Sequence, residues 1–158
     1  MTPAIALLKK QNIPHQVLPY EHDPNVASYG HEAAEKLGVA AEKVFKTLLV
    51  VTDKHELLVG VVPVLKHLDL KALAHAAAVK KVEMANPDLA QKSTGYLIGG
   101  ISPLGQKKHL KTFIDESAKT LDLMYVSGGR RGLDVALAPQ DLAKVLAASF
   151  VAIAREKD

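Results

Sequence analysis

Cysteine is absent from the 158 residues of this sequence. Its absence excludes disulfides, thiolate metal sites and a cysteine nucleophile, and nothing indicates an oxidising compartment. Tryptophan is also absent, and with three Phe and four Tyr the sequence is poor in large aromatic side chains. We therefore expect a core of Val, Leu, Ile and Ala. No apolar run approaches the roughly 20 residues that a membrane helix requires.

The N-terminal residues have no basic segment followed by an apolar run, so we expect no signal peptide and a cytoplasmic protein without membrane contact. Apolar residues make up 48% and charged residues 23% of the chain. That balance is typical of a globular protein, and the length predicts one domain over 1–158. A net charge of +3 and a pI of about 9.0 are compatible with a polyanionic partner.

Capping residues and apolar periodicity together predict five helices. Three begin at a hydroxyl or Asn residue and end near a glycine or asparagine, and the other two show an apolar face at helical spacing. The predicted helices are one after Thr2 ending near Asn12, one from Ser28 to Gly38, one from Asp69 to Ala77, one from Asn86 to Gly95, and one from Pro139 to Ser149.

Apolar and β-branched runs predict strands between these helices. They comprise a strand at 15–20, in which Pro19 favours an edge position, a hairpin of 45–51 and 56–62, strands at 111–114 and 124–127, and a strand at 133–137 with one buried face. Helices and strands alternate irregularly. This order favours an α+β domain with a mixed, barrel-like sheet flanked by helices.

Glycine is concentrated in the second half of the chain. Seven of the ten glycines lie between Gly95 and Gly132, in one group at 95–105 and another at 127–132. Glycine turns let a ligand approach backbone amides, and successive amides form concave sites for anions or oxyanions. The alternative is that both groups are tight turns at strand ends.

Basic residues accompany both glycine groups. Lys107, Lys108 and Lys111 follow the first, and Arg130 and Arg131 lie within the second. Beside such turns they are candidates for contacts to nucleic-acid phosphates. The alternative is a solvated charged face.

Lys46 and Asp134 each interrupt an apolar strand. A buried charge must reach a partner or a cleft, unless its strand has a solvent face and the side chain points outward. Tyr20 is compatible with either the core or a site. The seven histidines show no helical pair spacing, so we expect no metal site.

Several stretches together carry a resemblance to a known family. They are 1–4, 20–24, 35–38, 46–50, 80–85, 93–108 and 127–134, of which 93–108 is highly specific. These stretches resemble the bacterial YbaK family, deacylases of Cys-tRNA(Pro) and related misacylated tRNAs. The likeness covers nearly the whole chain. The same fold serves as an editing domain in some prolyl-tRNA synthetases.

The resemblance implies a pocket for the aminoacyl end of tRNA, with the tRNA and prolyl-tRNA synthetase as partners and no DNA, metal or cofactor. Carried over by position, the catalytic residues would be Lys46, Gly99, Gly100, Ile101 and Asp134. The substrate-binding residues would be Tyr20, Tyr29, Thr47 and Ser127, with Lys107, Lys108, Arg130 and Arg131 as candidate phosphate contacts. Tyr29 stands where the family often has Phe, and Arg130 where Lys is common.

In the mechanism attributed to this family, the substrate cysteine thiol attacks its own ester, so that the protein orients the substrate and stabilises an oxyanion. The resemblance thus implies a hydrolase, or a lyase by thiolactone release, that serves translation fidelity. The alternatives are a deacylase of Ala-tRNA(Pro) or of another small mischarged residue, a non-catalytic tRNA-binding module and a nucleotide-binding regulator.

Overall fold

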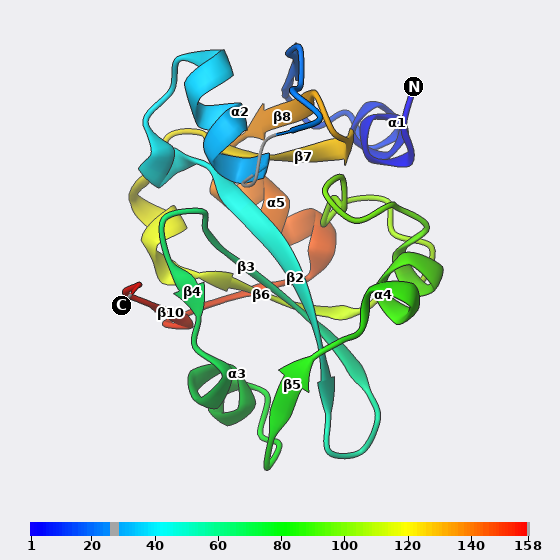
Figure 1. Ribbon diagram of the computed structural model, residues 1–158, viewed down its shortest axis with the longest axis vertical. Helices are drawn as coiled ribbons and strands as arrows, with labels where there is room; N and C mark the ends of the chain where they lie inside the picture. The colour runs from blue at the N-terminus through cyan, green and yellow to red at the C-terminus, as the bar shows by residue number, and fades with distance from the viewer. Residues whose placement is uncertain (26–28, 158) are drawn as a thin grey trace.

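The computed structural model describes residues 1–25 and 29–157. Helices and strands alternate along the chain as in an α+β domain (Figure 1). The elements are α1 (Pro3–Lys10), β1 (Gln16–Pro19), α2 (Tyr29–Leu37), η1 (Ala41–Lys43), β2 (Phe45–Thr52), β3 (Leu57–Pro63), β4 (His67–Leu68), α3 (Leu70–Ala76), β5 (Val82–Met84), α4 (Pro87–Thr94), β6 (Lys111–Asp115), η2 (Glu116–Thr120), β7 (Met124–Arg130), β8 (Leu133–Leu137), α5 (Pro139–Leu146), β9 (Ser149–Val151) and β10 (Ala154–Arg155).

The largest sheet is mixed and has the strand order β5-β2-β3-β6-β9. Strand β2 pairs antiparallel with β3 and β5, whereas β6 runs parallel to β3 and β9. A second, antiparallel sheet has the order β1-β8-β7, and β10 pairs with β4. The mixed sheet and flanking helices confirm the predicted α+β class. The described strands of these sheets do not close into a barrel.

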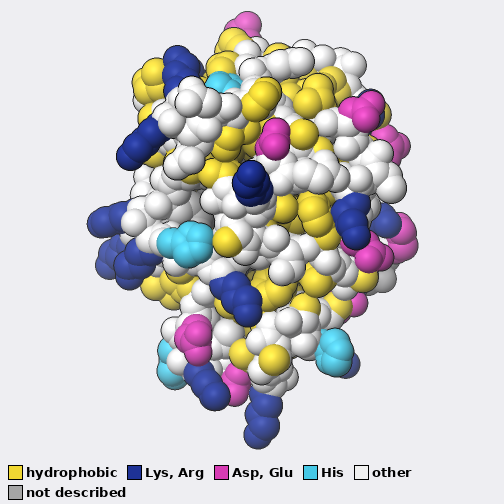
Figure 2. Space-filling model, turned by 180° about the vertical axis from the view of Figure 1, so that it is seen from behind, with side chains coloured by type: hydrophobic (Ala, Val, Ile, Leu, Met, Phe, Trp, Pro, Cys, Tyr) yellow, Lys and Arg dark blue, Asp and Glu magenta, His cyan; other side chains and the backbone are white. Residues whose placement is uncertain are grey.

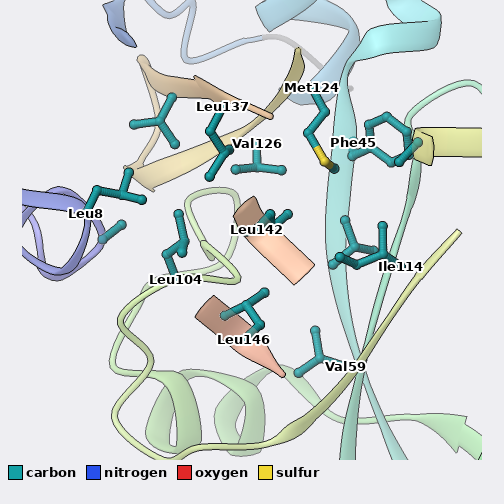
Figure 3. Close-up of a cluster of buried hydrophobic side chains, with 14 of the residues drawn as sticks. Leu8, Phe45, Val59, Leu104, Ile114, Met124, Val126, Leu137, Leu142 and Leu146 are labelled. Atoms are coloured by element: carbon teal, nitrogen blue, oxygen red, sulfur yellow. The ribbon is translucent and has the colours of Figure 1, made fainter. Parts of the chain in front are cut away.

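The two larger sheets meet where β2 begins. A parallel bridge joins Val44 to Tyr125 of β7, and the main core fills the space between the sheets. Figure 3 shows this core, with Leu8 of α1, Phe45 of β2, Ile114 of β6 and Leu142 of α5 directed inward. Aliphatic side chains dominate it, as the shortage of aromatic residues predicts.

The opposite face of the large sheet is also covered. Val50, Val62 and Phe113 pack there against Leu73 of α3. A third, smaller cluster lies beneath α2 and contains Ala33, with Tyr125 packed against it. None of the described helices is long and apolar enough to cross a bilayer.

The helix boundaries follow the caps that the sequence predicts. Thr2 Oγ1 accepts the Ile5 N–H at 3.3 Å, and Asn86 Oδ1 accepts the Leu89 N–H at 2.8 Å. Gly95 ends α4 in the left-handed region with φ 81°, and Gly38 follows α2 with φ 68°. The predicted start of the second helix, Ser28, lies outside the described residues.

Two predictions are wrong in detail. The last helix ends at Leu146 rather than at Ser149, because Ala147 adopts a left-handed φ of 52° and Ser149 begins β9 beside β6. Strand β8 is buried at all five positions rather than on one face. The face of β8 that carries Ala136 is covered as well. Tyr125 of β7 lies opposite Ala136 and packs against the cluster beneath α2.

Candidate functional site

A cavity of about 350 Å³ lies between α2, the first half of β2, the glycine loop 95–105 and strands β7 and β8. Its apolar wall includes Ala33, Val44, Phe45 and Val64. It brings together nearly all the residues that the resemblance places at a substrate, which are far apart in sequence: Tyr20, Tyr29, Lys46, Thr47, Gly99, Ile101, Ser127, Arg130 and Asp134.

Asp134 is the acid of this cavity. It lies in the middle of the β1-β8-β7 sheet, opposite Ser127 of β7 and Leu18 of β1, and is only 5% exposed. Burial raises the pKa of its carboxyl to about 7, and no described residue donates a hydrogen bond to that carboxyl. Tyr20 is close enough to sense it, because burial and then the Asp134 charge raise the pKa of the Tyr20 hydroxyl. The carboxyl is thus buried without a cation and is suited to a cationic ligand.

Lys46 faces the same cavity from β2. Its side chain therefore reaches a cleft instead of pointing outward, which decides between the two interpretations of the sequence. Burial, and then the neighbouring Lys157 ammonium, lower the pKa of Lys46. The next residue, Thr47, has a buried hydroxyl with no hydrogen-bond partner in the described part of the chain. A buried hydroxyl without a partner is costly, so a ligand would satisfy it.

The first glycine loop lines the cavity with Gly99 and Ile101 but not with Gly100. The Gly100 N–H donates to Leu97 O at 2.9 Å within a turn. The N–H groups of Gly99 and Ile101 donate to no acceptor among the described residues, and both residues line the cavity. Tyr96 closes the loop, because its hydroxyl donates to Leu104 O at 2.6 Å.

The two glycine groups pack against each other. Gly99 has φ 90°, and a Cβ there would lie 2.5 Å from Arg131 Nε and 2.9 Å from the Tyr29 ring. A Cβ on Gly100 would lie 2.6 Å from Arg130 Cα. Glycine is therefore required at both positions, by a close approach and at Gly99 also by a positive φ.

The predicted phosphate contacts separate into three environments. Arg131 donates to the Tyr29 hydroxyl, and its guanidinium carbon lies 4.0 Å from the centre of that ring. Arg130 is exposed and lines the cavity. Lys107 and Lys108 are exposed but lie outside it, beyond the end of α4. Lys and Arg side chains gather along the edge that carries α4, seen from behind in Figure 2.

The structure adds residues that the sequence analysis missed. Phe45, Leu48 and Ile98 contribute apolar wall, and Lys157 reaches the cavity from the C-terminal end of the described chain. No motif marks Lys157, because its position depends on how β10 pairs with β4. A second cavity of about 450 Å³, between the end of α1 and α5, contains none of the candidate residues.

Comparison with known proteins places this site in a family. The profile of the aminoacyl-tRNA editing domain matches residues 23–145. An Enterococcus faecalis protein named "Putative Cys-tRNA(Pro)/Cys-tRNA(Cys) deacylase EbsC" is 34% identical over 96% of this chain and 92% of its own length. The chain belongs to the aminoacyl-tRNA editing domain family. The YbaK resemblance of the sequence is thereby confirmed.

Solved structures show the same fold. A crystal structure described as that of "a putative trans-editing enzyme for prolyl tRNA synthetase" superposes with a TM-score of 0.85 at 21% identity, over 97% of this chain and 95% of that one. A protein described as hypothetical superposes with a TM-score of 0.87 at 22% identity, over 97% and 99%. The part matched by the editing-domain profile contains Lys46, Thr47, Gly99 and Asp134, whereas Tyr20 and Lys157 lie outside it.

Proposed function

We propose that this editing domain is a trans-editing deacylase that removes cysteine from Cys-tRNA(Pro), and also from Cys-tRNA(Cys). The observation that carries the proposal is the cavity of about 350 Å³, which holds one buried carboxyl, unpaired loop amides and cations. It is large enough for a small aminoacyl ester. The name of the Enterococcus faecalis relative, which is 34% identical, supports cysteine as the amino acid.

Asp134 and Tyr20 hold the α-ammonium of the esterified amino acid. A cation placed beside the Asp134 carboxyl compensates for the desolvation that raises its pKa to about 7. The bound ammonium therefore favours the ionised acid, and the acid holds the ammonium in a fixed orientation. Orienting the reacting groups in this way supplies much of what an intramolecular reaction requires.

The ester carbonyl lies against the glycine loop. The N–H groups of Gly99 and Ile101 donate to the oxygen as it becomes negatively charged, which is oxyanion stabilisation by fixed dipoles. Gly100 supports this geometry through its bond to Leu97 O and does not itself donate to the substrate. Thr47 and Ser127 supply hydroxyls around the ester, and Tyr29 forms a wall of the cavity.

The nucleophile is the thiol of the substrate. Its sulfur forms a bond to the ester carbon while the bond from that carbon to the ribose oxygen breaks. The thiol proton passes to the departing ribose oxygen, and water then opens the resulting thiolactone to free cysteine. No protein nucleophile is needed, in agreement with a chain that lacks cysteine.

The test is the loss of labelled amino acid from Cys-tRNA(Pro), Ser-tRNA(Pro), Ala-tRNA(Pro) and Pro-tRNA(Pro) with purified protein. We expect fast loss of cysteine only, because a serine hydroxyl is a much weaker nucleophile than a thiol at neutral pH. Equal rates for cysteine and serine would contradict the thiol mechanism. If alanine were lost fastest, the protein would be a deacylase of Ala-tRNA(Pro) instead. Binding of tRNA without turnover would indicate a tRNA-binding module.

Lys46→Ala tests Lys46 as the cation that meets the terminal ribose, a phosphate or the developing negative charge, with Lys54→Ala as its matched control on the exposed β2–β3 turn. We expect a loss of deacylation only in the first variant, and full activity of Lys46→Ala with normal folding would contradict the role.

Selectivity for tRNA(Pro) comes from prolyl-tRNA synthetase in this proposal. Adding the synthetase should raise the preference for Cys-tRNA(Pro) over Cys-tRNA(Cys).

A further inference from the structure

The cavity contains more positive charge than the reacting ester requires. Among the described residues, Lys46, Arg130 and Lys157 line it, with Asp134 as the one acid beside them. Asp134 is assigned to the α-ammonium, and neither Lys46 nor Lys157 forms an ion pair with any described acidic residue. Two ammonium groups that face one cavity without an anion repel each other, and their arrangement favours an anionic ligand between them.

The chain leading to Lys157 is firmly placed. The buried carboxylate of Asp115 accepts the N–H groups of Ile153 at 3.0 Å and Ala154 at 2.9 Å. Strand β10 then pairs antiparallel with β4, and Lys66 Nζ lies 3.1 Å from Glu156 Oε1. The pairing of β10 with β4 and the hydrogen bonds to the Asp115 carboxylate thus direct the last described residues toward the cavity.

We propose that Lys157 forms, with Lys46, a two-cation subsite that holds the phosphodiester linking the last two nucleotides of the tRNA. The inference rests on the proposed function, and it concerns a residue outside the stretch that the editing-domain profile matches. A phosphate has several acceptor oxygens and can accept hydrogen bonds from two ammonium groups at once. The loop amides of Gly99 and Ile101 already serve the ester oxygen, which leaves both lysines for the adjoining phosphate.

The other titratable groups of the cavity are compatible with lysines that bind the phosphate and loop amides that bind the ester oxygen. Asp134, Tyr20 and Tyr29 lie with Lys46 and Arg130 around the same space. Burial lowers the pKa of Lys46, and the Lys157 ammonium lowers it further, as expected of a second cation near the first. A bound phosphate would offset both effects and keep Lys46 protonated.

A binding experiment without turnover tests the subsite. The dinucleotide CpA, adenosine and inorganic phosphate are titrated into the protein, and the amide signals of Thr47 and Gly99 are followed by NMR. We expect CpA to bind more tightly than adenosine. Lys157→Gln should weaken CpA binding by about three- to fivefold, the scale of one screened charge contact, and leave adenosine binding unchanged. Lys157→Arg should retain the affinity, and Lys54→Gln should change nothing.

The same samples give a second readout, the pKa of Lys46 followed by NMR of its isotopically methylated ammonium. Lys157→Gln should raise that pKa toward its ordinary value, a shift that a merely structural role of Lys157 would not cause. The proposal is overturned if Lys157→Gln changes neither CpA affinity nor the pKa of Lys46, or if CpA binds no better than adenosine. Phosphate binding as tight as that of CpA would overturn the assignment to the terminal nucleotide.

These outcomes are independent of deacylation. If no aminoacyl-tRNA is hydrolysed but the CpA contrast stands, the proposed reaction fails and the subsite remains. If cysteine is released but Lys157→Gln binds CpA like the unmodified protein, the reaction stands and the subsite fails.

Discussion

Two buried aspartates, each 5% exposed, lie in different regions of this molecule and have opposite surroundings. Asp115, at the end of β6, accepts N–H groups of Ile153, Ala154 and Ser117. Asp134, on β8, accepts no hydrogen bond from any described residue and faces a cavity. The first carboxylate holds the C-terminal chain in place, whereas the second is buried at a cost to stability and is available to a ligand. Burial alone therefore does not distinguish a structural acid from a functional one. The distinction comes from whether other residues donate hydrogen bonds to the carboxylate.

The largest expected effect is on catalysis at Asp134. Asp134→Asn keeps the shape of the side chain but removes its charge, so the α-ammonium of the substrate loses its partner. We expect kcat/KM for Cys-tRNA(Pro) to fall by about 10²–10³-fold, the scale of breaking a desolvated charge contact. Single-turnover deacylation measures it. A loss of less than about fivefold would place the ammonium elsewhere.

Asp115→Ala is expected to act on stability instead. Three backbone N–H groups lose their acceptor, two of them at Ile153 and Ala154, and the free energy of unfolding should fall by about 2–4 kcal/mol. Urea denaturation gives the value. Deacylation below the melting transition should fall far less than in Asp134→Asn, and an equal loss in both variants would remove the distinction between the two acids.

Asp134 also predicts how stability changes with pH. The folded protein holds the Asp134 proton up to a pKa of about 7, above the ordinary value of 3.8, so this group lowers stability as pH rises from about 4 to about 7. Asp134→Asn should therefore raise the free energy of unfolding at pH 8, by on the order of 2–4 kcal/mol, with little effect near pH 4. Urea denaturation of both proteins at the two pH values checks this. A variant that is less stable at pH 8 would contradict the unpartnered carboxyl.

The neighbouring arginines repeat the comparison on a smaller scale. The Arg131 guanidinium contacts Tyr29, whereas the Arg130 guanidinium forms no ion pair or hydrogen bond with a described residue, and Arg130 lines the cavity. Arg130→Ala should reduce the slope of tRNA affinity against salt by about one phosphate contact. Arg131→Ala should leave that slope unchanged and lower stability by about 1 kcal/mol. Binding measured across salt concentrations and thermal denaturation separate the two, and a lower slope in Arg131→Ala would restore it as a phosphate contact.

The contrast between Asp115 and Asp134 also shows how far sequence reasoning reached. Asp134 stood out because it interrupts an apolar strand, and the resemblance assigned it to the site. Asp115 was not singled out, since two of its three partners are backbone N–H groups almost 40 residues away, which no local pattern encodes. Lys157 was missed for the same reason.

By itself the sequence determined the local elements of this protein: the caps at Thr2 and Asn86, the β2–β3 hairpin, the aliphatic core and the glycines that permit close approach. Propensity, periodicity and capping act over a few residues and can be read directly from the chain. Only the tertiary structure decided that β8 is buried on both faces, that Arg131 is committed to Tyr29 and Arg130 is not, and that Lys157 reaches the cavity. Each of these depends on which distant segments pack together, and that packing follows from burial of the whole core rather than from any local pattern.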